Sequence, residues 1–559
     1  MSFNWPSHWH VEVADHKSTL IERVRQARGF GDETEWHNWL QLDFDKSFLD
    51  PWSLPDMKVA VARLIQAKKK KEQIGIYGDY DADGLPGAAL LLRGLTLAGF
   101  ERLICIIPTR DEGYGLRAAK IDWLAEQGVT LILTVDTGIT AATEIKLAND
   151  KGIDVIVTDH HEPIGNLPPA LAVVDPKRAD STYQNRDLVG TGVAYKLLWA
   201  LYEKLGISHT PLKWQLDLVA VATIADMMEL NAENRVLVHY GLQVLRKSRN
   251  VGLAALMRVA GMVLDKVDTG QISFGIAPRL NAPSRLARER HEIGQQVVDN
   301  VVLTLLTTTD EQQALEAAAL INQLNLHRQN SIQALVNEAL QLKAVPTGGG
   351  VYYLPEAPAG LVGLVAGQLS ELSGWPVLVM ADINGSTRGS ARSPTKLSIV
   401  DLLTAHASYL SQFGGHAQAG GFSVKPTKVK GFCQQVERYL AEQARQYPAT
   451  TDRLVDTVIE PTEANLANAK ILDQLAPFGI GNPKPRFALT ATVREVKRLG
   501  KEGQHVRLQF EQPYPAAIWF GVKQTLPEVG QSIAAIANLA VNNYWQPTPQ
   551  LGIIELVNL

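Results

Sequence analysis

The sequence has few cysteines, no long apolar run and no excess of positive charge. Its two cysteines, Cys105 and Cys433, lie outside any CxxC pair, which argues against a disulfide framework or a thiolate zinc site and favours a reducing compartment. No stretch of about 18 apolar residues occurs and the first residues lack a basic segment followed by an apolar one, so we expect a cytoplasmic protein without a membrane span. The formal net charge of −4 attracts no nucleic acid, so any affinity for nucleic acid must be local.

The chain is long enough for several domains. Its 559 residues correspond to about four folding units, and 46% hydrophobic with 20% charged residues is an ordinary globular composition. From residue 74 to residue 174 short apolar runs alternate with helical stretches, which predicts an α/β domain whose largely parallel sheet is covered on both faces. The expected strands are residues 74–77, 103–107, 131–135, 155–157 and 171–174.

A long helical stretch follows this first domain. Thr308 and Thr309, followed by Asp310, have the spacing of a helix start with a capping box, and helix formers continue to about residue 342. A helix of about 33 residues spans roughly 50 Å, more than one domain needs internally, so we expect a connector between two lobes. The predicted order is an N-terminal segment 1–50, a catalytic domain 51–305, the connector helix 306–345, a smaller α/β domain 346–430, a linker helix 431–454 and a β-rich domain 455–559.

Acidic residues and histidines follow three of the predicted strands. Three carboxylates, Asp79, Asp81 and Asp83, share the loop after the first strand, and they repel one another unless cations or hydrogen bonds compensate. Asp136 and His160 follow two later strands. Because loops after parallel strands share the carboxyl edge of the sheet, we expect these side chains to converge. They are joined by Asp226, which ends an apolar helical stretch where an unpartnered carboxylate is costly.

Each of these features alone has a simpler explanation. Asp136 alone is most simply a helix cap, and a histidine pair is more often surface or core than a ligand. The loop 79–83 alone suits a calcium loop, although the EF-hand pattern and its closing Glu are missing. Taken together, carboxylates with an imidazole and no thiolate suit Mn²⁺ or Mg²⁺, and two ions bridged by one Asp suit phosphoester chemistry.

The motifs, in this order, resemble those of the DHH phosphoesterase superfamily. The resemblance rests on Asp-Tyr-Asp-Ala-Asp-Gly at 79–84, Val-Asp-Thr-Gly at 135–138, Asp-His-His at 159–161 and Ala-Asp at 225–226. Further segments are similar to its RecJ branch of single-strand-specific 5′ to 3′ DNA exonucleases: Phe-Gly-Ile-Ala-Pro-Arg-Leu-Asn-Ala at 274–282, Gly-Ser-Ala-Arg-Ser at 389–393, Gly-Gly-His-Ala-Gln-Ala-Gly-Gly at 414–421 and Pro-Phe-Gly-Ile-Gly-Asn-Pro-Lys-Pro at 477–485. The implied architecture is an α/β DHH domain with a parallel sheet, joined by the long helix to a smaller α/β DHHA1 domain, plus a C-terminal β-rich OB-fold.

The resemblance also assigns roles to residues of this sequence. It makes five residues the ligands of two Mn²⁺ or Mg²⁺ ions: Asp81, Asp83, Asp136, His160 and Asp226. Asp136 would bridge the ions, and Asp79 is either a ligand or a neighbour of the ligands. His161 contacts the scissile phosphate, assists proton transfer or has a purely orienting role. The implied reaction is two-metal hydrolysis of phosphodiester bonds with release of 5′-mononucleotides.

Exonuclease action from a 5′ end requires a phosphate pocket near the ions, and arginine binds phosphate with two parallel hydrogen bonds. The predicted substrate-binding residues are Arg110, Arg279, Asn281, Ser390, Arg392 and His416. For each arginine the alternative is a structural ion pair, and for His416 it is a loop histidine. A narrow cleft between two lobes would admit one strand and exclude a duplex.

The C-terminal region carries a local positive charge. From residue 484 to residue 507 there are seven basic and two acidic residues, a net of +5. With Phe487, Trp519, Tyr544 and Trp545 this β-rich region resembles an OB-fold on which bases stack. The alternative is that the aromatic residues belong to the core and the basic face is merely solvated. The resemblance implies single-stranded DNA as substrate, a single-strand-binding protein and a helicase as partners, no membrane, and a role in DNA repair and recombination.

Two other functions are compatible with parts of the chain. Relatives that cleave oligoribonucleotides or small nucleotides share the DHH and DHHA1 parts but are much shorter and generally lack an OB-like tail, so the extra length favours polymeric DNA. Non-catalytic DHH scaffold proteins lose metal-binding acids, whereas this chain keeps all of the expected ligands. The sequence therefore favours the nuclease.

Overall fold

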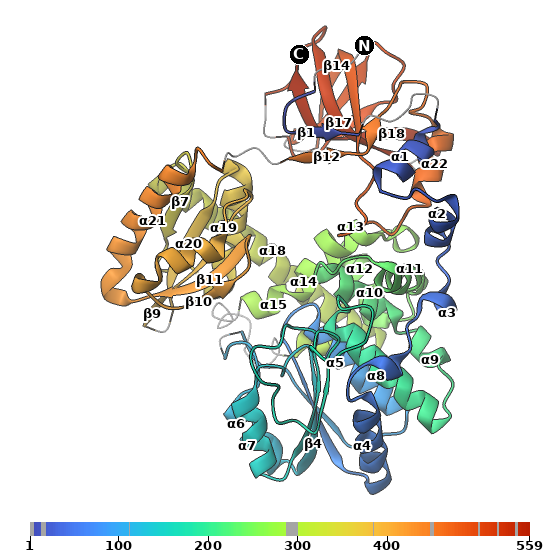
Figure 1. Cartoon of the computed structure of the whole chain (residues 1–559), viewed down its shortest axis with the longest axis vertical. Helices are drawn as coiled ribbons and strands as arrows, with labels where there is room; N and C mark the ends of the chain where they lie inside the picture. Colours follow the sequence, from blue (N-terminus) through green and yellow to red (C-terminus); the bar gives the residue numbers. More distant parts are fainter. Residues whose placement is uncertain are drawn as a thin grey trace. The chain divides into compact units, whose positions relative to one another are not determined.

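The computed structural model describes the whole chain except residues 1–4, 13–17, 111, 287–299, 384, 448–451, 501–502, 523–524 and 543–545. The chain divides into two compact units, Phe44–Ala449 and a unit that combines Met1–Asp43 with Thr450–Leu559 (Figure 1). None of the described helices has the length and apolar character needed to cross a bilayer.

The larger unit contains a parallel sheet of order β3-β2-β4-β5-β6. Its strands are β2 (Gln73–Gly78), β3 (Leu103–Ile106), β4 (Val129–Val135), β5 (Asp154–Thr158) and β6 (Ala172–Val174). The central strands are almost continuously apolar and buried because helices cover both faces. The chain passes from β2 outward to β3 and then returns to β4 on the other side of β2, so the order switches between β2 and β4, a point where α/β sheets commonly bind ligands. The predicted parallel sheet is confirmed.

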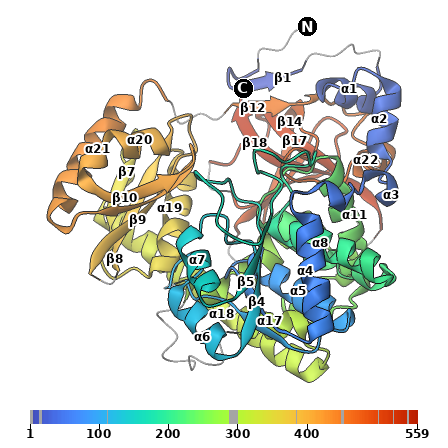
Figure 2. The same cartoon turned by 60° about the horizontal axis from the view of Figure 1, so that its bottom comes forward.

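Two layers of helices enclose this sheet. One face carries α4 (Met57–Lys70), α5 (Gly84–Leu97) and α8 (Gly190–Leu205), and the other carries α6 (Ala118–Glu126) and α7 (Ala142–Asp150) (Figure 2). A helical region follows, which comprises α9 (Thr210–Lys213), α10 (Leu216–Ala225), α11 (Ala232–Lys247), α12 (Val251–Val259), α13 (Thr269–Gln271), a π-helix (Ile272–Ile276), α14 (Ala277–Leu280), α15 (Ala282–Arg285) and α17 (Val301–Thr307).

The predicted connector is the helix α18 (Glu311–Leu342). Its N-cap is Asp310, whose side chain accepts a hydrogen bond from the N–H of Gln313 at 2.7 Å, so the helix begins after Asp310 and not at the two threonines. An Asp at this position satisfies a free N–H of the first turn.

A second sheet, of order β10-β11-β9-β8-β7, follows the connector. It contains β7 (Gly350–Tyr353), β8 (Val377–Ile383), β9 (Ser386–Arg392), β10 (Leu410–Gly415) and β11 (Ala419–Val424), and only the β7–β8 pair is parallel. The helix α19 (Ala359–Ser373) packs on one face, and α20 (Ile399–Ala405) and α21 (Val429–Gln443) pack on the other. The helix predicted as a linker in 431–454 is α21, and its Phe432, Val436 and Leu440 lie in the core of this domain.

The smaller unit is a five-stranded barrel of order β14-β15-β16-β18-β17, closed by the pair β14–β17. Its strands are β14 (Phe487–Leu499), β15 (His505–Phe510), β16 (Ala517–Trp519), β17 (Ser532–Asn542) and β18 (Thr548–Asn558). This order is that of the predicted OB-fold. N-terminal residues complete the unit: β1 (Trp9–Val11) pairs with β12 (Arg453–Val455), while α1 (Leu20–Ala27) and α2 (Glu33–Leu40) pack into the barrel's core.

Candidate metal centre and phosphate site

The acidic loop after β2 is shaped by its own carboxylates. Asp81 Oδ1 accepts hydrogen bonds from the N–H groups of Asp83 at 2.9 Å and Gly84 at 3.0 Å, at the start of α5. Asp83 accepts from the N–H groups of Gly190 and Thr191, both at 2.8 Å, at the start of α8. A Cβ at Gly190 would lie 2.8 Å from Asp136 Cβ, so only glycine allows α8 to approach the acidic centre this closely. Two helix starts therefore fix the loop.

Asp136 and His160 reach the same point from the next two strands. Asp136 directly follows β4 with a φ of 60°, an uncommon backbone conformation for a residue other than glycine, and is 2% exposed. His160 follows β5, and its Nε2 lies 3.1 Å from Asp136 Oδ1, 3.5 Å from Asp83 Oδ2 and 3.6 Å from Asp226 Oδ2. The convergence predicted from the sheet edge is thus observed, and α10 delivers Asp226 to it.

The predicted ligands, together with His161, form overlapping groups whose possible ligand atoms lie within 4.8 Å of one another. The groups are Asp79, Asp81 and Asp136; Asp83, His160 and Asp226; and Asp136, His160 and His161. Three buried atoms here have no hydrogen-bond partner among the described residues: Asp79 Oδ1, Asp136 Oδ1 and His160 Nδ1. Unpartnered buried acceptors are costly, and a cation would satisfy the two carboxylate oxygens, so this donor set fits a hard divalent metal ion.

Burial and mutual repulsion raise the pKa values of these carboxyl groups. Burial and the charge of Asp81 raise the pKa of Asp79 to about 7 and that of Asp83 to about 6. Burial and the charges of Asp83 and Asp81 raise the pKa of Asp226 to about 8, and the pKa of Asp136 also lies well above its ordinary value. Without a cation, the site is electrostatically unfavourable in its fully ionised form.

The two adjacent histidines have opposite protonation. Burial and the positive charge of His161 lower the pKa of His160 to about 3, so His160 is a neutral imidazole. Burial opposes protonation of His161 as well, but the hydrogen bond and charge of Asp159 outweigh it and raise the pKa of His161 to about 9. His161 Nδ1 lies 2.8 Å from Asp159 Oδ1 and 3.1 Å from the hydroxyl of Tyr114. Asp159 thus orients His161.

Five arginines gather beside the acidic centre. They are Arg110 after β3, Arg279 in α14, Arg285 in α15, Arg328 in α18 and Arg392 in β9. Burial and the charges of Arg110 and Arg328 lower the pKa of Arg285 to about 9, although Asp81 opposes this shift. Among the described residues, none of the five forms an ion pair with a carboxylate.

The hydrogen bonds of these arginines go to neutral groups. Arg279 donates to Asn322 Oδ1 at 2.9 Å, and Arg328 donates to Asn325 Oδ1 at 2.9 Å. Arg285 donates to the carbonyl of Gly360 at 3.2 Å, and Arg392 donates to Ser390 Oγ at 2.8 Å. Arg110 stacks on the ring of Tyr80 at 4.4 Å. The structural ion pairs considered as alternatives are therefore absent from this described set, and the cluster suits an anion.

The remaining predicted substrate residues are placed differently. Asn281 Oδ1 accepts a hydrogen bond from the N–H of Ala82 at 3.0 Å, so it ties the helical segment of Arg279 to the acidic loop. Ser390 lies next to Arg392. His416 lies in the exposed turn between β10 and β11, and the structure does not place it among the groups above.

Sequence reasoning missed three residues of this region: Tyr114, Arg285 and Arg328. Arg285 follows a quoted motif by three positions, and Tyr114 stands between two glycines, Gly113 and Gly115. These were usable signals. Arg328 lies in the middle of a 32-residue helix, where an exposed arginine is ordinary, so nothing in the sequence singles it out.

In the barrel the expectation of stacking by Phe487 and Trp519 is wrong, because these side chains are buried in the core at 0% and 6% exposure. Tyr544 and Trp545 lie outside the described residues, as do Lys501 and Glu502 of the basic region. A partly exposed aromatic pair is found instead on β15 and after β16: the rings of His505 and Phe520 are 5.3 Å apart.

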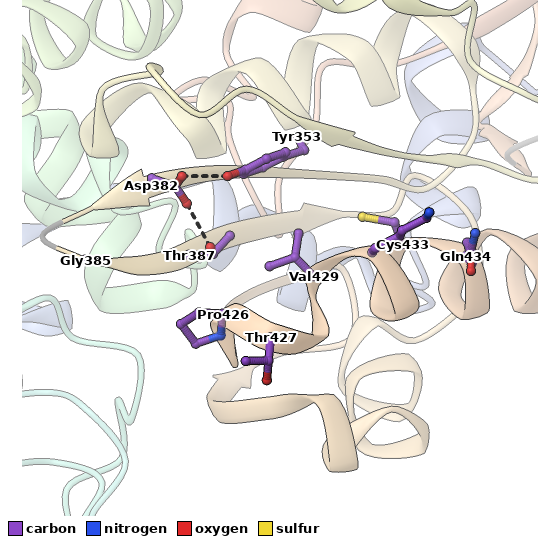
Figure 3. A pocket seen from close by; sticks show the side chains of 10 residues that line it. Tyr353, Asp382, Gly385, Thr387, Pro426, Thr427, Val429, Cys433 and Gln434 are labelled. Atoms are coloured by element: carbon purple, nitrogen blue, oxygen red, sulfur yellow. Dashed lines mark hydrogen bonds between the residues drawn. The ribbon is translucent and has the colours of Figure 1, made fainter.

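A cavity of about 750 Å³ lies in the second α/β domain, between β7, β8 and β9 and the start of α21 (Figure 3). At its wall Tyr353 and Thr387 donate hydrogen bonds to Asp382 at 2.6 and 2.8 Å. No predicted site residue is among its described lining, so this hollow is separate from the acidic centre.

Comparison with known proteins agrees with this arrangement. Three family models match: the DHH family N-terminal domain over residues 73–223, the DHHA1 domain over 347–442 and the RecJ OB domain over 455–555. The single-stranded-DNA-specific exonuclease RecJ of Bacillus subtilis is 32% identical over 88% of this chain and 61% of its own length. RecJ of Haemophilus influenzae is 32% identical over 89% of this chain and 88% of its own.

Solved structures extend the comparison. The crystal structure of RecJ from Thermus thermophilus in complex with Mn²⁺ is 30% identical and covers 96% of this chain and 75% of its own, with a TM-score of 0.79. The same protein in complex with Mg²⁺ aligns with a TM-score of 0.73. With RecJ relatives aligned along almost the whole chain and matches to all three domain models, this chain belongs to the RecJ family of single-stranded-DNA-specific exonucleases.

Proposed function

We propose that this protein degrades single-stranded DNA from the 5′ end and releases 5′-mononucleotides by two-metal hydrolysis. The observation that carries the proposal is the juxtaposition of two centres of opposite charge. Buried carboxylates of raised pKa suit divalent cations, and arginines without acidic partners suit the phosphates of a strand.

The acidic residues divide into holders of two ions. We assign Asp79, Asp81 and Asp136 to one ion and Asp83, His160 and Asp226 to the other, with Asp136 as the bridge. Bound Mn²⁺ or Mg²⁺ would lower the pKa of a water molecule and stabilise charge on the phosphoryl oxygens. The role of the chain is to hold the ligand atoms in place through the two helix starts and the neutral imidazole of His160.

His161 is assigned to contact the scissile phosphate. Asp159 holds its Nδ1, and the raised pKa keeps the ring protonated at neutral pH, so Nε2 also carries a proton. A fixed imidazolium at the edge of the centre is an electrostatic partner for a phosphoryl oxygen, and its orientation is set before the substrate arrives.

The arginine cluster is assigned to the 5′ end of the strand. Arg110, Arg279 and Arg392, with Ser390, are joined in this role by Arg285 and Arg328, while Asn281 positions the segment of Arg279. His416 would contact the strand from the glycine-rich turn of the DHHA1 domain.

The barrel is assigned to binding the strand without reading its sequence. Its β15 and β16 are the second and third strands of the fold, which form the usual oligonucleotide face of OB-folds. Lys497 pairs directly with Arg507 across β14 and β15, and like charges in this position are unfavourable without an anion. Family membership further implies a cytoplasmic location, a role in repair and recombination, and a single-strand-binding protein and a helicase as partners.

One digestion experiment tests the function. Single strands labelled at the 5′ or 3′ end, duplexes and short oligoribonucleotides are incubated in parallel with Mn²⁺ or Mg²⁺, and the products are resolved by size. We expect immediate release of a labelled mononucleotide from 5′-labelled single-stranded DNA alone. Preferential cleavage of short RNA would favour an oligoribonuclease, and no cleavage at all would favour a scaffold protein.

A further inference from the structure

Phe274 is the most exposed of the large hydrophobic side chains in the described part of the chain, at 86%. It lies in the π-helix Ile272–Ile276, whose Ile272, Gly275 and Ile276 are buried. The inward positions of this turn are therefore filled, and a Cβ at Gly275 would already lie 2.1 Å from Met262 Cε. Phe274 is held on the outside of a packed segment. Its ring is therefore available to stack on a partner at the surface of the protein.

The π-helix determines what lies beside Phe274. Its hydrogen bonds join residues five apart, as in the bond from the N–H of Ala277 to the carbonyl of Ile272. Arg279 lies in α14, directly after the π-helix, and its Nη1 donates a hydrogen bond at 2.8 Å to the carbonyl of Gly275, the neighbour of Phe274. Arg279 belongs to the arginine cluster and carries no acidic partner among the described residues. π-helical turns are frequent at functional sites.

The same segment is fixed to the acidic centre. Asn281 Oδ1 accepts a hydrogen bond from the N–H of Ala82 at 3.0 Å. Phe274 precedes Asn281 by seven residues, which corresponds to roughly 10 Å along a helix. The segment that carries Phe274 is therefore attached to the acidic loop at which a bound strand would meet the ions. An exposed aromatic ring next to an arginine is the usual combination for an unpaired base and its phosphate.

We propose that Phe274 is a stacking platform for a nucleobase of the bound single strand, placed by the π-turn next to the phosphate bound by Arg279. Every base has a flat face, so the platform accepts any sequence, but an internal base of a duplex has both faces covered by its neighbours and offers no free face to the ring. Phe274 would thus contribute to strand selectivity. This inference rests on the proposed function, because it requires single-stranded DNA at the acidic centre.

The test separates base stacking from catalysis. In the Asp136→Ala background, which prevents digestion, binding of a short single strand is measured with and without Phe274→Ala. We expect Phe274→Ala to weaken binding about 5- to 100-fold and Phe274→Trp to restore it. Leu97→Ala is the matched control, because Leu97 is 57% exposed at the far end of α5 from the acidic loop, and it should change binding less than twofold.

A base deletion scan gives the readout that a structural defect would not move. An abasic site is placed at each position of the strand in turn, and one position should weaken binding to the Phe274 protein. This loss of affinity at the abasic position should disappear in Phe274→Ala. When 2-aminopurine replaces the base at the same position, its fluorescence should change on binding to the Phe274 protein and should not change on binding to Phe274→Ala. When Phe274→Ala is made in the protein that retains Asp136, its KM should rise while its kcat stays within twofold of the wild-type value.

Three results would overturn the proposal: binding unchanged by Phe274→Ala, an abasic penalty that persists in the variant, or a wild-type dimer that Phe274→Ala converts to a monomer, which would make Phe274 a contact between copies. Failure of the proposed function is separate, because the wild-type protein would then not digest single strands from the 5′ end.

Discussion

The acidic centre and the arginine cluster both hold buried charges without counterions, but the charges have opposite sign. In the acidic centre, burial raises the pKa values of Asp79, Asp83 and Asp226 because their negative charges lack a counterion. In the cluster, burial and neighbouring guanidinium groups lower the pKa of Arg285 for the same reason with the opposite sign. The charge of Asp81 raises the pKa of Arg285, but this attraction is smaller than the effects of burial and of the neighbouring arginines. The two regions therefore do not neutralise each other.

This difference shows how the chain prepares for its ligands. If the carboxylates and guanidinium groups were paired, both regions would be more stable and neither would bind an ion or a phosphate. Asparagines and carbonyl groups hold the arginines instead, so that the side chains are oriented and their charge is retained. Part of the folding free energy is thus given up for function, as is common at active sites.

The largest effect should come from the bridging carboxylate. Asp136→Ala removes a group common to two of the three ligand sets, and losing metal-based stabilisation of several kcal/mol corresponds to an activity loss on the order of 10³-fold. Release of 5′-mononucleotides in the presence of Mn²⁺ measures it, and circular dichroism checks the fold. The control is Asp122→Ala, an exposed carboxylate in α6 paired with Lys151. Activity within tenfold of wild type would refute the bridging role.

The arginine cluster should respond more weakly. Arg285→Gln removes one of five positive charges, and we expect kcat/KM to fall about 10- to 100-fold, chiefly through KM, because phosphate contacts act on the bound strand before chemistry. Steady-state kinetics on 5′-phosphorylated single strands measures the change. Arg438→Gln is the control, since Arg438 is 74% exposed in α21. An equal loss in both variants would mean that only net charge matters.

The barrel unit should affect long strands more than chemistry. Deleting 455–559 alone would expose Leu20, Val24 and Trp36, which lie in the barrel's core, so the appropriate truncation keeps residues 44–449. We expect binding of long strands to weaken about tenfold, with turnover of a very short strand nearly unchanged. The salt dependence of binding should also become shallower. Equal loss of turnover on short and long substrates would contradict a binding role.

Much of this molecule follows from local sequence patterns. Apolar runs at regular spacing predicted five strands of a largely parallel sheet, and the rule that their loops share an edge predicted that Asp136 and His160 meet. Side-chain exposure was not predictable in the same way: Trp519 and Phe520 are neighbours in sequence, yet one is in the core and the other is 67% exposed. That difference depends on strand register, which a single sequence leaves open.

The contacts between segments that are distant in sequence could not be predicted either. Arg328 belongs to the cluster only because α18 passes next to α14 and α15, and Asn322 of α18 holds Arg279 of α14 for the same reason. Neither the helix pattern nor a motif predicts which face of a long connector meets a site.

The smallest expected effect concerns stability. The metal-free protein should become less stable as the pH rises, and a bound metal ion should counteract this loss. Carboxyl groups with folded pKa values of about 6 to 8 bind more protons in the folded protein than in the unfolded one, where the pKa is about 3.9. Their contribution to the free energy of unfolding is therefore complete below the unfolded pKa, and it is lost as the pH rises through the pKa values of the folded protein. The melting temperature of the metal-free protein should fall between about pH 7 and pH 8.5, a window in which His160 is neutral when folded and mostly neutral when unfolded, since the unfolded pKa is about 6.5.

Two further measurements sharpen this comparison. The increase in melting temperature caused by Mn²⁺ should grow over the same window, because the ion binds the deprotonated carboxylates. Asp226→Asn should make the pH dependence of the metal-free protein shallower, since it removes the group whose pKa is about 8. His161, with a pKa of about 9, acts in the same direction as the carboxyl groups, and the charge of Asp226 contributes to its raised pKa. The difference between the two proteins therefore reports Asp226 together with its effect on His161. A melting temperature that rises with pH without metal would show that the acidic centre is already neutralised by the chain itself.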